Sequence, residues 1–546
     1  MSEDDTGHLD EWDEAGWGDA EGARPPLRLS SVAPDGRLEL LLHPSYMSAG
    51  VDRALEMLAT HPEGQRVYRQ GRRLVLASQG VGDPGVVEMT DAMMAYEVDR
   101  CMVVKAIGKD GKERSGPPPA AMIAQMLTGM SQAVGRVRPL AGVLAAPFLA
   151  PSGEVVTERG YHAPSGYLMT DDAIDVTVRQ APTQAHAAAA LDVLRDVFVD
   201  FPYPIEADRH VPIAALLTIL ASPAIRGNVP AFLFDATTAG SGKTLQQDVI
   251  SAITTGHVGR KTPWIRDEDE RRKTIMAAAL HGGPVLAFDN VSREVPFGGA
   301  DIDMLLTSGG KLAFRGLGAK DLLLVDWRPV ILASGNSIGL TGDTNRRVLR
   351  GRLETPEEDP ENRTEYAHPE RANRLVEWVL ENRARLLSAA LTILRAFCVA
   401  DRPNPLRLGS FAEWAALVPS AIVYAGGPNV LDCVPRADDI ANETDAELRT
   451  LLSSWPVLAR FMPRVWEVRD LIACLWANER ENVELEDVRD AIADACSARM
   501  GSAPSSKSVG KLLAKRRGRI MGGRKLDGRR DPHRDRMVWE IVKVTK

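Results

Sequence analysis

The sequence predicts an α/β protein of several domains. At about 150 residues per domain, a chain of 546 residues corresponds to three or four domains. Three short apolar stretches lie between residues 230 and 340, and each resembles a strand that ends in a polar residue. A helical pattern with one apolar face follows from about residue 361. Hydrophobic residues make up 44% of the chain and charged residues 26%, so several ordinary cores can form.

Membrane-spanning and secreted classes are not expected. The longest uncharged runs, Ser115–Gly135 and Trp414–Leu431, contain Pro, Gly and polar residues, so neither resembles a bilayer span. The N-terminus has no Lys or Arg before Arg24 and no apolar core, unlike a secretory signal. The cysteines are widely spaced without a CxxC pair, which fits a reducing compartment. We therefore expect a cytoplasmic protein with no membrane partner.

Charge is unevenly distributed along the chain. The formal net charge is -8, yet residues 1–22 contain nine acidic residues and no Lys or Arg. Residues 503–546 contain fourteen Lys or Arg and four Asp or Glu, which is a net charge of +10. The acidic start is predicted to belong to a disordered tail over residues 1–45. The basic end indicates a module that binds nucleic acid.

Residues 46–185 are predicted to form an N-terminal α/β domain. Strand-like runs at Arg73–Ala77 and Gly142–Leu149 alternate with a helical run at Ala120–Ala133. A turn-rich stretch, Gly160–Tyr167, closes this region. The next predicted domain, 186–360, carries the strongest chemical signals.

The first of these signals is a glycine-rich loop between a strand and a helix. The apolar strand Phe232–Asp235 runs into Thr237–Thr244, whose sequence is TTAGSGKT, and a helical stretch continues to about Thr255. This is the strand–loop–helix context that a P-loop requires. Thr237 stands where the first glycine of GxxxxGK[ST] is usual, but the GSGKT part is intact.

The loop residues are predicted to bind ATP. Small residues let backbone N–H groups wrap a phosphate chain at a helix N-terminus. Lys243 is expected to meet the β- and γ-phosphates, and the Thr244 hydroxyl is placed for Mg²⁺. The predicted ATP-binding residues are Ala239, Gly240, Ser241, Gly242, Lys243 and Thr244.

A second apolar strand, Val285–Asn290, places Asp289 forty-six residues after Lys243. A strand that ends in Asp is what a Walker B element needs, because its carboxylate meets the metal beside the P-loop. We therefore predict that Asp289 and Thr244 hold Mg²⁺. Many ATPases place Glu after this Asp to orient the attacking water, whereas this chain has Asn290, which we take as a candidate catalytic residue. The general base stays open between Asp289 and Glu294.

A third apolar strand starts at Val330 and ends in Asn336, forty-seven residues beyond Asp289. Asn336 is predicted to reach the γ-phosphate or its water, and a plain turn asparagine is the alternative. A basic run follows, in which Arg346 and Arg347 are candidates for the arginine that reaches a neighbouring subunit's phosphate in ring ATPases. Ordinary solvated surface is the alternative for this run.

The three motifs fit into 100 residues, Thr237–Asn336. This compact arrangement resembles the superfamily 3 helicases, AAA+-related replicative helicases of small viruses, plasmids and phages. That family carries a β-hairpin with a basic tip between its second and third motifs, where it lines a central channel. A glycine-rich turn between strand-like runs lies at this position here. The resemblance implies DNA contacts by Lys311, Arg315 and Lys320, with an ordinary surface hairpin as the alternative.

The chain also resembles the ATPase part of primase–helicase proteins from phages and integrated elements, over about 130–546. The matching stretches are GYHAPSG before the P-loop, the Asp-Asn pair, ASGN, GDxxRR and GSFAEW. Those relatives often have a primase–polymerase domain in front, but 46–185 is short for one, and Asp171, Asp172 and Asp175 do not form a convincing metal triad. We expect a motor that works with a separate primase or other replication proteins.

Residues 361–462 are predicted to form a helical lid region, and residues 463–546 resemble a winged helix. Ser508–Arg517 would be the recognition helix, and Arg519–Leu526 and Arg536–Val544 would be the wing strands. The clustered basic charge predicts contact with DNA phosphates. The candidate contacts are Lys515, Arg516, Arg517 and Arg519.

Together these features predict a P-loop AAA+-like ATPase core with an N-terminal α/β domain, a helical lid and a C-terminal winged helix. The expected function is an ATP-dependent replicative DNA helicase of a phage, plasmid or integrated mobile element. It would form a homo-oligomeric ring, such as a hexamer, on single- and double-stranded DNA. Two alternatives are a DNA-binding initiator or helicase loader without processive unwinding, and a non-motor P-loop scaffold. Thr237 and Asn290 favour the scaffold, whereas Lys243, Thr244 and Asp289 count against it.

Overall fold

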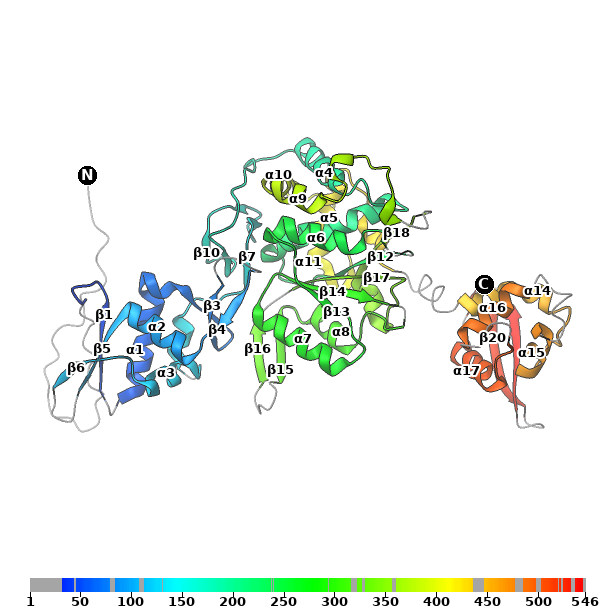
Figure 1. Cartoon of the computed structure of the whole chain (residues 1–546), viewed down its shortest axis with the longest axis horizontal. Helices are drawn as coiled ribbons and strands as arrows, with labels where there is room; N and C mark the ends of the chain where they lie inside the picture. Colours follow the sequence, from blue (N-terminus) through cyan, green and yellow to red (C-terminus); the bar gives the residue numbers. More distant parts are fainter. Residues whose placement is uncertain are drawn as a thin grey trace. The chain divides into compact units, whose positions relative to one another are not determined.

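The structure of the chain is a computed structural model (Figure 1). It describes residues 32–43, 46–78, 84–107, 112–129, 131–236, 238, 240–292, 294–315, 322–326, 329–355, 360–435, 446–476, 485–496, 502–518, 520–521, 524–531 and 536–543.

The chain divides into two compact units. The first comprises Met1–Leu76 and Glu88–Pro139, and the second comprises Ala77–Val87 and Leu140–Lys546. The sequence pattern predicts a first domain boundary at residue 185. The structure differs because apolar residues after Pro139, such as Phe148 and Tyr167, are buried in the core of the second unit.

Within the described residues, the first unit combines three α-helices with the sheet β1–β5–β6, and the sheet β2–β3–β4 includes residues of both units at its β3 and β4 strands. Val51, Leu55 and Leu58 recur every three or four residues of α1, so they share its buried face. Strand β1 pairs in parallel with β5, which corrects the expectation of an unstructured tail up to residue 45. The elements of this unit and its border are β1 Leu38–Leu42, α1 Met47–Thr60, η2 Pro62–Arg66, β2 Val67–Gln70, β3 Arg73–Ala77, β4 Val86–Glu88, α2 Asp91–Cys101, β5 Met102–Ile107, β6 Glu113–Ser115, α3 Ala120–Leu127 and η3 Gln132–Arg136.

The second unit is built on a parallel sheet with the strand order β13–β14–β17–β12–β18 within the described residues. Parallel neighbours need crossover connections, and α6 and α7 supply the two that join β12, β13 and β14. The expected mixed α/β core is therefore present. Its strands and crossover helices are β12 Ala231–Ala236, α6 Lys243–Thr255, β13 Lys261–Pro263, α7 Glu268–His281, β14 Val285–Val291, β17 Val330–Asn336 and β18 Val348–Leu353.

Helices cover both faces of this sheet (Figure 1). Successive residues of a strand point to opposite faces, and β12 follows this rule. Phe232 and Phe234 lie in one core with helices α5, α6, α10 and α11, whereas Leu233 lies in another core with α7 and α8. Because the central strands are buried on both faces, they are continuously apolar rather than alternating.

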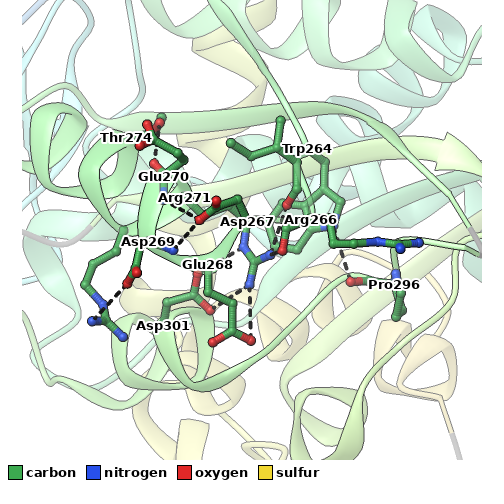
Figure 2. Close-up of polar contacts among 12 residues, drawn as sticks. Trp264, Arg266, Asp267, Glu268, Asp269, Glu270, Arg271, Thr274, Pro296 and Asp301 are labelled. Atoms are coloured by element: carbon green, nitrogen blue, oxygen red, sulfur yellow. Dashed lines mark hydrogen bonds and ion pairs between the residues drawn. The ribbon is translucent and has the colours of Figure 1, made fainter.

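Arg271 belongs to α7 and links this helix to α8 on the sheet face that carries Leu233 (Figure 2). Its guanidinium is 5% exposed, pairs with Asp301 at 3.0 Å and lies 4.6 Å from the Trp264 ring centre. It also donates to the carbonyl of Ile265 at 2.9 Å. Asp301 belongs to α8 (Ala300–Thr307), the helix that precedes the hairpin of β15 (Lys311–Arg315) and β16 (Leu322–Asp326). The network therefore orients the helix that leads into the predicted DNA-contacting hairpin.

The helical region after the sheet shares the sheet's core instead of forming its own. Trp414 is fully buried, and its indole N–H donates to Thr218 of α5 at 2.8 Å. The remaining elements of this part are β7 Gly142–Leu144, β8 Phe148–Leu149, β9 Val155–Val156, β10 Gly160–His162, β11 Tyr167–Met169, α4 Gln184–Val197, α5 Glu206–Ala221, η4 Ser222–Ala224, η5 Gly342–Arg347, η6 Pro360–Asn362, η7 Pro369–Arg371, α9 Leu375–Glu381, α10 Arg383–Val399, η8 Gly409–Phe411, α11 Ala412–Tyr424 and η9 Val430–Cys433.

The C-terminal segment has a separate core, in which Trp466, Leu513 and Trp539 are buried together. The strand that the sequence predicted to end at Leu526 extends to Asp531. The winged-helix assignment itself stays a prediction. The elements are α13 Ala446–Ser453, α14 Trp455–Leu458, α15 Val468–Trp476, α16 Glu486–Ala495, α17 Ser506–Arg516, β19 Ile520–Met521, β20 Arg524–Asp531 and β21 Arg536–Lys543.

Candidate nucleotide site

The glycine-rich loop joins the end of β12 to the start of α6. Gly240 and Gly242 have φ of +75° and +94°, and Gly242 is the N-cap of α6. These left-handed conformations favour glycine. The first backbone N–H groups of a helix have no intrahelical partner and lie at the positive end of its dipole. The loop therefore has the local geometry of an anion site. Thr237 and Ala239 lie outside the described residues.

Close neighbours also restrict these two positions to glycine. A Cβ at Gly242 would lie 2.9 Å from the Phe201 ring, and a Cβ at Gly240 would collide with the Glu361 side chain. Phe201 follows α4 and Glu361 follows β18, so two distant segments approach the loop. The sequence analysis did not single out either residue, because their proximity to the loop is not visible in the local pattern.

Lys243, the first residue of α6, lies in a partly buried and electronegative setting. Burial lowers the pKa of its ammonium. The negative charges of Asp289, Asp235 and Glu361 oppose this shift. The ammonium places positive charge beside the N-terminus of α6. A polyphosphate bound there would need this charge, because the nearby carboxylates would repel it. This setting fits the role predicted for Lys243.

Asp289 meets hydroxyl groups from two other elements. Its Oδ1 accepts hydrogen bonds from Ser334 of β17 at 2.5 Å and from Thr244 of α6 at 3.3 Å. The strands β12, β17 and β14 are parallel neighbours, so their carboxyl ends lie at one edge. This topology brings together the predicted metal pair, Thr244 and Asp289. Ser334 was missed, although alternation places it on the same strand face as Asn336.

The backbone is irregular at Asp289 and Asn290. The pairing of β14 with β17 shifts between Phe288 and Val291. Asn290 has φ of +59°, a conformation that asparagine adopts more readily than most residues. Its N–H donates to Asp289 Oδ1 at 2.9 Å. Asn290 is exposed, and its catalytic role stays a prediction.

Asn336 lies at the same edge of the sheet. It is exposed at the end of β17, in register with Ala236 at the end of β12. One residue earlier in β12, Asp235 forms a buried ion pair with Arg350 of β18 and accepts the Ile338 N–H at 3.0 Å. The ion pair joins β18 to β12, the strand that leads into the loop. The hydrogen bond joins the segment after Asn336 to the same strand. The role of Asn336 toward a γ-phosphate stays a prediction.

The two candidate arginines have different environments. Arg346 is 67% exposed and pairs with Asp343 at 2.9 Å. Arg347 is 14% exposed and pairs with Asp303 of α8 at 2.9 Å. The structure therefore separates an accessible guanidinium, Arg346, from one that is held within its own subunit, Arg347.

A cavity of about 530 Å³ adjoins the loop. Its wall contains apolar side chains from α4, α6 and α9 beside a few charged groups, which is the usual composition of a small-molecule site. The Arg363 guanidinium lies 4.5 Å from the Tyr366 ring centre at this wall. The apolar lining residues include Val197, Phe201, Leu245, Tyr366, Leu375 and Val376.

An ion-pair cluster closes one side of this cavity. Asp196 pairs with Arg371 at 2.8 Å and with His368 at 2.6 Å. Burial alone would raise the pKa of Asp196, but the hydrogen bonds from Arg371 and His368 outweigh burial and lower it. Arg371 also lies 3.8 Å from the Trp378 ring centre. The cluster holds the segment after η6 against α4.

The structure describes only some of the residues that are predicted to contact nucleic acid. Lys311 is exposed at the start of β15, and Arg315 ends that strand opposite Leu322. Lys320 lies outside the described residues, as does Arg519. These roles stay predictions.

In the C-terminal segment, Arg517 is exposed, and its guanidinium lies 3.7 Å from Asp527. Lys515 belongs to α17. Arg516 is 6% exposed, which corrects its assignment as a surface contact because a buried guanidinium cannot reach a DNA backbone. Lys507 and Lys511, which the sequence analysis did not select, are exposed on the same helix.

The donor set fits Mg²⁺ bound together with a nucleotide. Among the described residues, no three His, Cys, Asp or Glu side chains gather as a metal site. Mg²⁺ commonly takes one or two protein oxygens plus phosphate oxygens and water. Thr244 and Asp289, whose oxygens lie 3.3 Å apart, match that requirement.

No protein-family model and no curated protein matches the chain. Among solved structures, the A-form apo C-terminal region of NrS-1 aligns with 87% of this chain and 96% of its own, at a TM-score of 0.37 and 9% identity. Two JCV helicase structures, one with a substituted N-phenylacetamide bound, cover 48% of this chain and 73% of their own. Their TM-score is 0.20, with 15% and 16% identity. We therefore derive function from the geometry of the site.

None of the helices within the described ranges combines the length and apolar character that crossing a membrane requires.

Proposed function

We propose that the chain is an ATP-dependent motor that acts on DNA, a replicative helicase of the superfamily 3 type from a phage, plasmid or integrated mobile element. The observation that carries the ATPase part is the meeting of Thr244 and Asp289, 3.3 Å apart, beside Lys243 at the N-terminus of α6. Three strands contribute to this edge, so the arrangement depends on the whole sheet.

Each group at the edge has a role in this proposal. The loop N–H groups and Lys243 bind the phosphates, and Thr244 and Asp289 hold Mg²⁺, which supplies charge neutralisation at the transferred phosphoryl group. Ser334 fixes the orientation of the Asp289 carboxylate through the 2.5 Å hydrogen bond. Asn336 faces the γ-phosphate or its water.

The cavity beside the loop takes the base and ribose of ATP. Its volume of about 530 Å³ and its apolar wall suit a purine, and it borders Gly240 and Gly242, where the phosphates begin. Tyr366 and Val376 contribute apolar surface to it, and Arg363 lies over the Tyr366 ring. Tyr366→Ala is expected to raise the KM for ATP more than it lowers kcat.

The nucleic-acid part of the proposal rests on charge. The segment 503–546 has a net charge of +10, and binding through phosphates scales with such charge. The hairpin of β15 and β16 begins with the exposed Lys311. Subunits assemble into a ring in which Arg346 reaches the phosphate bound by the neighbour.

Asn290 favours a second candidate, a scaffold that binds ATP and hydrolyses it slowly. The residue after the metal-binding Asp is an amide here, and an amide cannot act as a general base at neutral pH. A DNA-binding initiator or loader, which hydrolyses ATP without processive unwinding, is the third candidate.

One pair of measurements separates these candidates. ATP turnover is measured with and without single-stranded DNA, and strand displacement is measured on a forked duplex. The motor requires turnover that DNA stimulates and ATP-dependent displacement. Turnover that DNA stimulates but that gives no displacement identifies the initiator or loader, and ATP binding with slow turnover that DNA does not change identifies the scaffold.

A further inference from the structure

A second cavity, of about 320 Å³, lies at the base of the hairpin. Three segments supply most of its lining, and Ala141 and Pro151 complete it. The segments are the turn between β10 and β11 with Tyr167, η4 with the loop after it, and the Gly309-Gly310 turn that enters β15. Its volume is at the lower end of the roughly 300–1,000 Å³ of typical small-ligand sites. The nucleotide site does not use this cavity, and one of the predicted hairpin contacts, Lys311, lines it.

Hydrogen bonds fix the loop after η4 to the start of the hairpin. Asn228 Oδ1 accepts the Gly309 N–H at 2.7 Å. Glu413, in the first turn of α11, accepts the N–H groups of Arg226 and Gly227 at 2.8 and 3.1 Å. Gly309 and Gly310 have φ of +62° and +82°, so this tight turn needs glycine. Two walls of the cavity are thus held in a fixed relationship.

The third wall is the motif GYHAPSG, which the ATPase site does not use. The Ser165 hydroxyl hydrogen-bonds His162 Nδ1 at 2.8 Å and accepts the Tyr167 N–H at 3.3 Å. The Gly166 carbonyl accepts the Ala141 N–H at 2.7 Å, which anchors the turn to the strand region of β7. Pro164 and Ser165 thereby present a preformed surface to the cavity.

The cavity is lined by apolar side chains and by two cationic side chains. Pro151, Pro164, Tyr167 and Pro223 supply rigid carbon surface, and Arg226 and Lys311 are exposed. The nearby carboxylate of Glu413 is engaged by two backbone N–H groups. An anionic group with an attached ring system matches this combination, because the cations neutralise the anion while the ring covers apolar surface.

We propose that this cavity holds one nucleotide of single-stranded DNA, with its phosphate at Arg226 and Lys311 and its sugar and base against the proline and tyrosine surface. The inference rests on the proposed DNA-dependent function and adds a contact at the base of the hairpin, away from its tip. Arg226 precedes β12 by only four intervening residues, and β12 leads directly into the phosphate-binding loop. The cavity and Lys243 therefore lie on either side of one strand, β12.

The test uses the full chain and a fluorescein-labelled oligothymidine in a salt series. Arg226→Gln, Lys311→Gln and the double variant are compared with Arg407→Gln, an exposed arginine outside the cavity. Because the two cations share one phosphate, the double variant should reduce the slope of log affinity against log salt by about 0.7, and each single variant by less. DNA stimulation of ATP turnover, expressed relative to each variant's own turnover without DNA, should fall in the double variant. Arg226→Lys should restore the slope.

The outcomes distinguish a failure of the proposed function from a failure of the proposed DNA site in the cavity. A wild-type chain that neither binds the oligothymidine nor hydrolyses ATP overturns the proposed function itself. If the wild-type chain binds and the double variant keeps its salt slope and stimulation, the cavity is not a DNA site. Equal effects from Arg407→Gln also overturn the inference, because they would reflect general surface charge. Unchanged thermal melting of the variants excludes misfolding as the cause of a loss.

Discussion

The hydroxyl of Ser334 lies 2.5 Å from Oδ1 of Asp289, between neighbouring strands of the central sheet. The same carboxylate oxygen accepts the Thr244 hydroxyl at 3.3 Å and the Asn290 N–H at 2.9 Å. Three donors from three directions fix the orientation of this carboxylate. Ser334 therefore acts as a positioning residue for the predicted metal ligand Asp289.

Ser334→Ala should weaken Mg²⁺ binding without removing the ligand. Loss of a hydrogen-bond partner of a metal-binding group typically costs about 10- to 100-fold in metal affinity. The Mg²⁺ concentration for half-maximal ATP turnover should rise by that factor, with turnover largely recovered at saturating Mg²⁺. Ser152→Ala, which removes an exposed hydroxyl, is the control. A Mg²⁺ dependence identical to wild type would remove Ser334 from the site.

Lys243→Ala should abolish ATP hydrolysis and leave the fold intact. The substitution removes the ammonium at the first position of α6, so the transferred phosphates lose their counter-charge. Turnover is measured beside Lys273→Ala, which removes an exposed lysine of α7. Wild-type turnover in Lys243→Ala at matched purity would refute the site assignment.

Arg346→Ala and Arg347→Ala should fail in different ways. Arg346→Ala protein should bind ATP and hydrolyse it about a thousandfold or more slowly, as for a missing arginine finger. Mixing it with Lys243→Ala protein should restore part of the activity at mixed interfaces. Arg347→Ala should instead lower thermal stability, because it breaks the partly buried pair with Asp303. Activity that is independent of protein concentration in a verified monomer contradicts the ring.

Reversal of charge at Lys507 and Lys511 should weaken duplex binding. Both side chains are exposed on α17, and two lost phosphate contacts should reduce the salt slope on duplex DNA by about 1.8. Fluorescence anisotropy at several salt concentrations measures this slope, with basal ATP turnover as the control. Deletion of 503–546 is a poorer test, because it removes Leu513 and Trp539 from the shared C-terminal core. Unchanged duplex affinity would argue against a DNA role for α17.

Arg271→Met should destabilise the sheet face that carries α7 and α8. Removal of one partner from a buried ion pair costs about 3–5 kcal/mol, because Asp301 would keep an uncompensated charge. Thermal melting followed by tryptophan fluorescence reports the change, since Trp264 contacts the guanidinium. The double variant Arg271→Met/Asp301→Asn should recover much of the loss. Equal melting of the single variant and wild type would show that the network is not stabilising.

Local sequence patterns predicted the elements around the nucleotide site closely. The strand expected at Phe232–Asp235 is β12, Ala231–Ala236, and the helix expected to reach Thr255 ends there. Apolar runs, glycine and the order of polar residues are sufficient for this, because strand and helix formation depend on near neighbours. The hairpin of β15 and β16 was likewise predicted from a glycine-rich turn between apolar runs.

Boundaries that depend on burial were predicted less well. Residues 140–173 were assigned to the N-terminal domain, because short strands look alike in any domain. Their apolar side chains are buried in the core of the second unit. Arg516 was selected for its charge, but its position on α17 faces the C-terminal core, so that the side chain is buried.

The sequence by itself determined which chemical groups are present: a glycine-rich loop followed by Lys243 and Thr244, an Asp-ended strand, and a basic C-terminal segment. These features are contiguous, so composition and spacing reveal them. Only the tertiary structure decided that Ser334 contacts Asp289, that Arg347 pairs with Asp303, and that Arg226 and Lys311 line one cavity. Such relationships join residues far apart in the chain, and they arise from the order of strands in the sheet and the packing of its two cores.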